Sequence, residues 1–227
     1  MKRNLLVFDI DDTLTKSEDQ HQTAYVSAMK QFGIKNINQD WKTYDHYTDS
    51  YILKVNYENN LTDKFDLSFI NEFEVVMANE LLKLQPTAEI KGATSMMDFI
   101  KHKSDYAICF ATGSLLQPAL LKLNHAGIQY ELPIVMGSNS TFERESIIKN
   151  AIEAAKKHYQ VNSFNHIISV GDGLWDVKAA QNLGLHFIGI GSKNHQNFMA
   201  QKVKSYIHDW TSFDLERVEK ELNIQHN

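Results

Sequence analysis

The fold is decided by the stretch Leu5-Leu6-Val7-Phe8-Asp9-Ile10-Asp11-Asp12-Thr13-Leu14. Its first four residues are apolar, which suits a strand that is buried on both faces. The carboxylates of Asp9 and Asp11 follow directly, where the chain leaves that strand. Because like charges repel, a site that gathers both carboxylates needs a cation nearby. The stretch therefore predicts a buried first strand that ends in a charged site.

Further apolar runs extend this strand into a predicted sheet. They lie at 106–111, 134–136, 167–170 and 186–190, and helical patterns of apolar residues separate them. An alternation of strands and helices predicts a parallel sheet with helices on both faces. The predicted fold class is α/β, with a doubly wound, Rossmann-like core. Sites in such folds form beyond the carboxyl ends of the strands.

Residues 16–88 interrupt the alternation, because their patterns are helical throughout. Ser17 with Gln20 predicts a capping box at the start of the first of these helices. The simplest organisation is a core domain made of residues 1–15 and 89–227, with a helical cap domain, residues 16–88, inserted after the first strand.

The cap is rich in aromatic residues. Tyr44, Tyr47 and Tyr51 have the spacing of one helical face. The simpler interpretation is that they form the core of the cap. The alternative is that they form a surface that closes over a substrate and excludes water.

Composition excludes several classes of protein. The 227 residues carry 23 Lys and Arg against 28 Asp and Glu, a net charge of −5, whereas a nucleic-acid binder is usually basic. No apolar run reaches the about 18 residues of a membrane-spanning helix, so no membrane partner is expected. The single cysteine, Cys109, cannot form an internal disulfide, which favours a cytoplasmic location.

A second pair of carboxylates follows the run at 167–170. Asp172 lies at the predicted strand end, and Asp176 lies in the first turn of the next helix. If this strand neighbours the first, these carboxylates meet Asp9 and Asp11, and an all-oxygen set of ligands suits Mg²⁺. The alternative is that Asp12 and Asp172 only cap helices, which explains so many carboxylates at two strand ends poorly.

A third strand end carries Thr112, Gly113 and Ser114 just before a helix. A hydroxyl, a glycine and the free N–H groups of a helix start together suit an anion. Ser114 is alternatively the cap of that helix, and these residues alone do not decide between the two interpretations.

Taken together, these motifs resemble those of the haloacid dehalogenase superfamily. The resemblance rests on Asp9-x-Asp11-x-Thr13, on an apolar strand ending in Thr112-Gly113, and on Gly171-Asp172-x-x-x-Asp176, in that order. It covers nearly the whole chain, and residues 16–88 look like the cap that this family inserts after its first motif.

The resemblance implies a role for each motif residue. Asp9 would be the nucleophile, Asp11 the general acid and base, and Thr112 with Gly113 the phosphate-binding residues. Mg²⁺ would be held by Asp9, Asp172 and the backbone carbonyl of Asp11, and Asp176 would be a further ligand or would hold one of these ligands in place. The acid at Asp11 points to the phosphatase and phosphomutase branches, because true haloacid dehalogenases lack it. Asp12 is expected to point away from the site and to cap a helix or face solvent.

The family also places a lysine between the second and fourth motifs, and here two cations compete for that position. Arg144 lies in the first turn of a predicted helix and shares the apolar stripe of Ile148 and Ala151. Lys149 is five residues further, about 140° around the helix and about 7.5 Å further from the site. We therefore expect Arg144 to bind phosphate and hold Asp9, and Lys149 to face solvent.

The leading functional prediction is a Mg²⁺-dependent phosphomonoester hydrolase that acts on a small phosphorylated metabolite. A sugar phosphomutase on the same scaffold would use the same carboxylates. A non-catalytic binding protein is the third hypothesis, and it conflicts with the intact catalytic set. The sequence predicts neither the substrate nor the oligomeric state.

Overall fold

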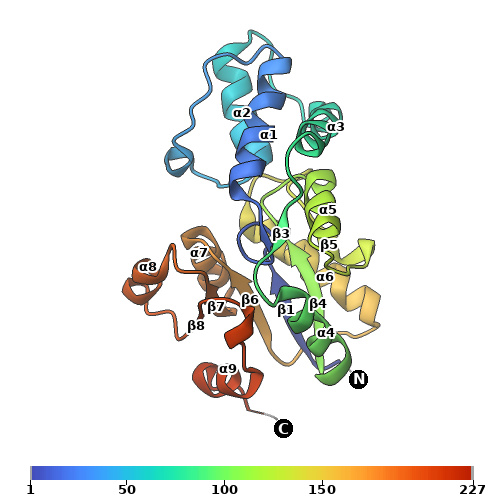
Figure 1. Cartoon of the computed structure of the whole chain (residues 1–227), viewed down its shortest axis with the longest axis vertical. Coiled ribbons are helices and arrows are strands. Elements are labelled where there is room, and N and C mark those ends of the chain that lie inside the picture. Colours follow the sequence, from blue (N-terminus) through green and yellow to red (C-terminus); the bar gives the residue numbers. More distant parts are fainter. Residues whose placement is uncertain (1, 226–227) are drawn as a thin grey trace.

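A computed structural model describes residues 2–225 and contains a six-stranded parallel sheet (Figure 1). The strand order is β5-β4-β1-β6-β7-β8, so β1 lies between β4 and β6. This arrangement confirms the predicted α/β fold class. The strands are β1 (Asn4–Phe8), β4 (Tyr106–Ala111), β5 (Val135–Met136), β6 (Ile167–Gly171), β7 (His186–Ile190) and β8 (Ser205–Ile207).

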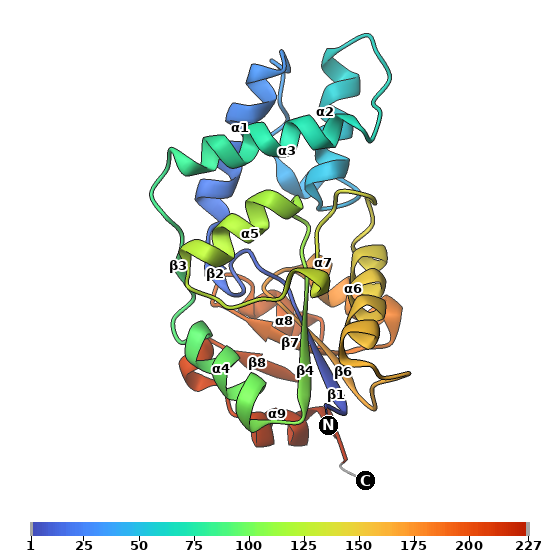
Figure 2. The ribbon, with the colours of Figure 1, turned by 90° about the vertical axis from the view of Figure 1, so that its right-hand side faces the viewer.

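Helices cover both faces of the sheet because both faces of its strands are apolar. In β1, Leu6 and Phe8 pack toward α4 and α9, whereas Leu5 and Val7 pack toward α6. Figure 2 shows α4 and α6 on opposite sides of β4. The core helices are α4 (Ala93–Lys103), α5 (Leu116–His125), α6 (Arg144–Tyr159), α7 (Leu174–Leu183), α8 (His195–Ala200) and α9 (Leu215–Leu222).

Three helices form a separate layer beyond the carboxyl ends of the strands (Figures 1 and 2). They are α1 (Glu18–Gln31), α2 (Asp49–Asn60) and α3 (Phe69–Leu82). These helices share their own apolar cluster, centred on buried side chains such as Tyr25, Phe73 and Met77. From here on, this layer is called the cap.

A two-stranded antiparallel ribbon joins the cap to the sheet. It consists of β2 (Thr15–Lys16) and β3 (Ala88–Glu89), with Lys16 paired to Ala88. Lys16 and Ala88, the two ends of the segment predicted to be the cap, therefore lie opposite each other in this ribbon. Helix α5 lies between the sheet and the cap, since Ala119 packs on the sheet and Leu115 joins the apolar cluster of the cap.

Two details differ from the sequence analysis. The strand β8 was not predicted, because three residues are too few to show an alternating pattern. The helical face assigned to Tyr44, Tyr47 and Tyr51 is wrong: a 3-10 turn at Trp41–Thr43 is followed by a non-helical segment with several bends, and α2 begins only at Asp49. Within residues 2–225, no helix combines the length and the apolar character that crossing a membrane requires.

Candidate active site

The site lies where three neighbouring strands end. Asp9 follows β1, Thr112 follows β4 and Asp172 follows β6, and β1 is hydrogen-bonded to both of the other strands. Parallel strands point their carboxyl ends to the same edge of the sheet, so the topology alone brings these three residues together. The cap covers this edge.

A carboxylate cluster forms the floor of the site. Asp9, Asp172 and Asp176 each place one carboxylate oxygen within 4.8 Å of the others, and all three residues are buried. Gly171 makes this approach feasible, because a Cβ there would collide with the Asp176 carboxylate. Three of the four residues predicted to hold the metal are therefore brought together by the fold.

Burial makes this cluster electrostatically costly. Burial and the charges of Asp9 and Asp176 raise the pKa of Asp172 well above its usual value. Burial, opposed by Arg144, raises the pKa of Asp176 to about 7. The cluster thus contains three carboxylates and one guanidinium, so its negative charge is only partly neutralised. A set of oxygen ligands with excess negative charge fits a hard divalent cation such as Mg²⁺.

Arg144 is the cation of this cluster. It is the first residue of α6, and its Nη2 donates to Asp9 Oδ1 at 2.5 Å and to Asp176 Oδ1 at 2.7 Å. Its Nε donates to the same Asp176 oxygen at 3.0 Å. Lys149, the competing candidate, is exposed on the same helix. The guanidinium therefore fixes the nucleophile candidate against a predicted metal ligand.

The loop after β4 contacts the cap as well as the site. The Thr112 Oγ1 accepts a hydrogen bond from the Ser114 N–H at 3.1 Å, and the Gly113 carbonyl accepts from the Asp49 N–H at 2.8 Å. A Cβ on Gly113 would lie only 2.7 Å from the backbone oxygen of Tyr47. Glycine at this position therefore lets the cap backbone approach the loop that is predicted to bind phosphate.

Ser114 does not cap α5, because the N-cap of that helix is Leu115 and no side-chain cap bond is present. The Ser114 hydroxyl donates instead to the Leu115 carbonyl, at 3.2 Å. The capping interpretation of Ser114 is therefore wrong.

Asp12 caps α1, as expected, but it also lines the pocket at the site, so the prediction that it points away from the site is wrong. Its Oδ1 accepts from the Ser17 and Glu18 N–H groups, both at 3.1 Å, and its own φ of 49° turns the chain toward that helix. The predicted capping box of Ser17 with Gln20 is wrong, because the Ser17 side chain makes no cap bond. The Ser17 hydroxyl donates to Asp11 Oδ1 instead, at 2.5 Å.

A lysine that the sequence analysis missed holds Asp11. Lys122, on α5, is fully buried, and its Nζ lies 2.6 Å from both oxygens of the Asp11 carboxylate. Burial works against the ionised carboxylate, but the charge and hydrogen bonds of Lys122 outweigh it and lower the pKa of Asp11 to about 2. The available signal was positional: Lys122 lies seven residues after Leu115 and three after Ala119, on the apolar stripe of the helix.

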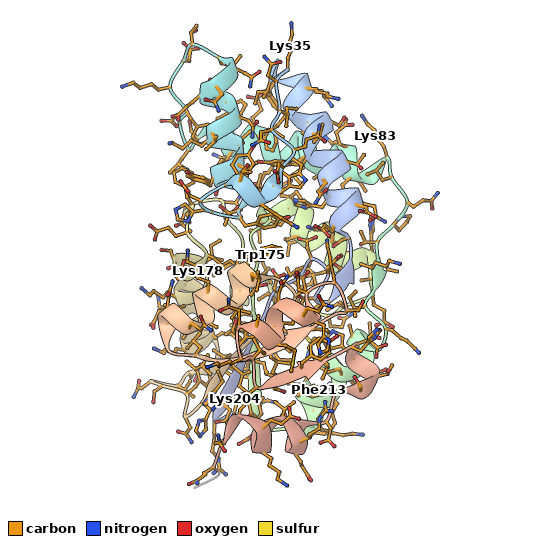
Figure 3. The ribbon with its side chains drawn as sticks, turned by 90° about the vertical axis from the view of Figure 1, so that its left-hand side faces the viewer. Lys35, Lys83, Trp175, Lys178, Lys204 and Phe213 are labelled. Carbon is orange, nitrogen blue, oxygen red and sulfur yellow. The ribbon has the colours of Figure 1, made fainter. Side chains whose placement is uncertain are left out.

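The cap lies closed over the site in this structure. Thr48 Oγ1 donates to the Phe142 carbonyl at 2.8 Å, and Ser50 Oγ donates to the Thr141 carbonyl at 2.9 Å. The ring of Tyr47 stacks on Trp175, with centroids 4.0 Å apart and planes 15° apart. Figure 3 shows Trp175 at the end of α7 that is nearest the cap. These contacts join the cap to the loops that carry the predicted site.

The enclosed pocket is shared by core and cap. Core carboxylates line one side, including Asp9 and Asp172, and cap side chains such as Trp41, Tyr47 and Ile52 line the other. A small substrate bound at the carboxylates would therefore contact the cap directly.

Solved structures of three other proteins share this fold across almost the whole chain. A haloacid dehalogenase hydrolase of family IA from Entamoeba histolytica is 18% identical, covers 97% of this chain and 99% of its own, and has a TM-score of 0.72. CbbY from Rhodobacter sphaeroides, in complex with phosphate, is 14% identical, with coverages of 99% and 100% and a TM-score of 0.70. A β-phosphoglucomutase from Clostridium difficile is 16% identical, with coverages of 98% and 98% and a TM-score of 0.68.

At these identities the similarity shows a shared fold. No curated protein matches the chain significantly. The sequence itself matches the family model of haloacid dehalogenase-like hydrolases over residues 6–190, which include every motif residue named above. The resemblance is thereby confirmed: the chain belongs to the haloacid dehalogenase-like hydrolases and is an enzyme of that type.

Proposed function

We propose that the chain is a Mg²⁺-dependent phosphomonoester hydrolase that acts on a small phosphorylated metabolite through an aspartyl-phosphate at Asp9. The observation that carries the proposal is the buried contact between Asp9 and the Arg144 guanidinium, within a cluster of carboxylates at three strand ends. A cytoplasmic location and the division into core (1–15 and 89–227) and cap (16–88) belong to the same proposal.

In the first step, an Asp9 carboxylate oxygen attacks phosphorus, and the bond from phosphorus to the ester oxygen breaks. Asp11 enters this step protonated and, because Lys122 favours its ionised form, gives the proton to the leaving oxygen. The products are a free alcohol and a phosphorylated Asp9. Arg144 keeps Asp9 pointing into the pocket and offers a planar, permanently charged group to a phosphate oxygen.

In the second step, a water molecule attacks the phosphorus of the aspartyl-phosphate. Asp11, now ionised, accepts a proton from this water, and the bond from phosphorus to the Asp9 oxygen breaks. Inorganic phosphate leaves and Asp9 returns as a carboxylate. Thr112 and Gly113 would hold the phosphoryl oxygens through both steps, since they lie at the adjacent strand end.

The metal site of this proposal consists of the Asp9, Asp172 and Asp176 carboxylates and the Asp11 backbone carbonyl. When bound, Mg²⁺ relieves the repulsion between the anionic nucleophile and the anionic phosphate. The raised pKa values of Asp172 and Asp176 support this assignment, because they indicate uncompensated negative charge.

The test is a screen of sugar phosphates, nucleoside monophosphates and phosphoglycolate with Mg²⁺, in which released phosphate and remaining ester are both measured. A phosphatase releases phosphate in step with ester loss, whereas a phosphomutase conserves the ester. Asp9→Asn should abolish turnover, and Asp98→Asn, on the exposed surface of α4, is the matched control. Phosphate release that survives Asp9→Asn would contradict the proposal.

A further inference from the structure

Lys122 is buried to an extent that is rare for a lysine. Its exposed fraction is 0%, and lysines are almost never fully buried unless they are paired. Its Nζ contacts both Asp11 oxygens at 2.6 Å, Ser114 Oγ at 3.1 Å and His21 Nδ1 at 3.0 Å. Removing such a charge from water is costly, so these partners have to stabilise it.

The hydrogen bonds around Lys122 assign a donor or acceptor role to each of its neighbours. An ammonium has only hydrogens to donate, so Asp11, Ser114 Oγ and His21 Nδ1 all act as acceptors. The hydrogen of the Ser114 hydroxyl goes to the Leu115 carbonyl. The His21 ring then carries its hydrogen on Nε2, which lies 2.9 Å from Asp49 Oδ1. Each side-chain polar atom of this network, from Asp11 through Lys122 and His21 to Asp49, therefore has a hydrogen-bond partner.

This network crosses from the core to the cap. Asp11 and Lys122 belong to the core, whereas His21 lies on α1 and Asp49 begins α2 of the cap. The second oxygen of Asp49 accepts the Leu115 N–H at 2.9 Å, so the cap also contacts the residue just before α5. Closure of the cap therefore completes the set of acceptors around Lys122.

Asp11 is held from two directions by this arrangement. Lys122 contacts both of its oxygens, and the Ser17 hydroxyl, at the junction between ribbon and cap, donates to Oδ1. The Asp11 side chain is 23% exposed, and Asp11 lines the pocket. A carboxylate restrained in this way has few other orientations, which is what proton transfer in a confined site requires.

We propose that Lys122 is a positioning residue that orients the Asp11 carboxylate for proton transfer, and that His21 and Asp49 make this orientation depend on a closed cap. The proposal rests on the phosphatase function proposed above. It assigns the buried lysine to the reaction and not only to the stability of the fold.

The test compares two substrates in the Lys122→Met variant. Nitrophenyl phosphate releases a stable anion and needs little help from an acid in the first step, whereas an alkyl phosphate such as glycerol phosphate needs the proton. If Lys122 orients the acid, kcat on glycerol phosphate should fall about 100-fold or more. The first-turnover burst of nitrophenolate should change less than about 5-fold, since that step does not depend on proton donation.

Three further variants separate positioning from stability. In the double variant Lys122→Met with Asp11→Asn, the loss on glycerol phosphate should not exceed that of Asp11→Asn alone, because both changes remove the same function. His21→Gln should give a smaller loss with the same preference for the alkyl ester. Lys149→Met, an exposed lysine on α6, should leave both rates unchanged.

Equal losses on the two esters, or losses that track the melting temperature across the variants, would overturn the role of Lys122 while leaving the phosphatase function intact. A wild-type protein that hydrolyses neither ester nor any ester of the screen would overturn both proposals together.

Discussion

Two buried cations organise this molecule, and they work in different surroundings. Arg144 lies wholly within the core, where it pairs with Asp9 and Asp176, two members of the three-carboxylate cluster that Asp172 completes. Lys122 lies at the boundary with the cap, where it faces the single carboxylate of Asp11 and the ring of His21. The first cluster has excess negative charge, and the second is close to balanced.

This difference is visible in the acids themselves. Burial and neighbouring carboxylates raise the pKa of Asp172, whereas the pKa of Asp11 is lowered to about 2 by Lys122 despite burial. An unbalanced cluster suits a divalent cation, and a balanced one suits a group that has to keep its orientation. The core cluster therefore suits the proposed cation site, and the contacts at the boundary with the cap suit the proposed positioning of Asp11.

The largest effect should come from breaking the core cluster. Arg144→Ala leaves Asp9 and Asp176 without their shared donor and is expected to lower kcat/KM about 10²–10³-fold. Lys149→Ala, five residues further along the same helix, should change it less than about 2-fold, because surface substitutions have small effects. Steady-state kinetics of both variants on one substrate are sufficient. Similar small losses in both would contradict the assignment of Arg144.

The unbalanced charge should also make the metal-free protein sensitive to pH. The folded-state pKa of Asp176 is about 7, above its ordinary value of 3.8, so the folded chain binds more protons than the unfolded chain between these values. Stability that is present at low pH should therefore be lost as the pH rises from about 4 to about 7.

Mg²⁺ should reverse this loss, because it binds the ionised carboxylates. At about 100 times its Kd, the ion should raise Tm by about 5–10 °C at about pH 8, and by much less at about pH 5. Asp172→Asn should weaken this shift, and differential scanning calorimetry measures it. A shift of the same size at both pH values would argue against binding at these carboxylates.

The smallest effect should come from the ring contact between the cap and α7. Tyr47→Ala removes the ring stacked on Trp175 and is expected to raise KM about 2–10-fold with little change in kcat. A change of this size corresponds to the energy of one aromatic pair. Tyr47→Phe keeps the ring and should restore KM. If Tyr47→Phe were as impaired as Tyr47→Ala, the stacked ring would not be the contact that matters.

The core was more predictable from the sequence than the boundary with the cap. The run Leu5–Phe8 and the residues after each strand are local patterns, and parallel topology converts them into one site. Helix geometry was likewise enough to expect Arg144 inside and Lys149 outside, and the structure places them so. These inferences needed only short stretches of chain.

The boundary depends on contacts between distant residues, which no local pattern contains. Lys122 and Asp11, for example, are 111 positions apart. The bond from the Ser17 hydroxyl to Asp11 is short-range, but it was missed because it replaces the capping bond that serine favours at the start of a helix. The spacing of the tyrosines suggested a helix, but residues 44–48 form a bent, non-helical segment from which Tyr47 stacks on Trp175.

The most direct test of the account is to find the phosphorylated residue. Enzyme mixed with excess phosphoester and Mg²⁺ is quenched in acid during turnover and reduced with borohydride, which converts an aspartyl-phosphate into homoserine. Peptide mass spectrometry should find homoserine at Asp9 in the wild type and nowhere in Asp9→Asn. Homoserine at another aspartate such as Asp172, or active enzyme that never carries phosphate on an aspartate, would contradict the account.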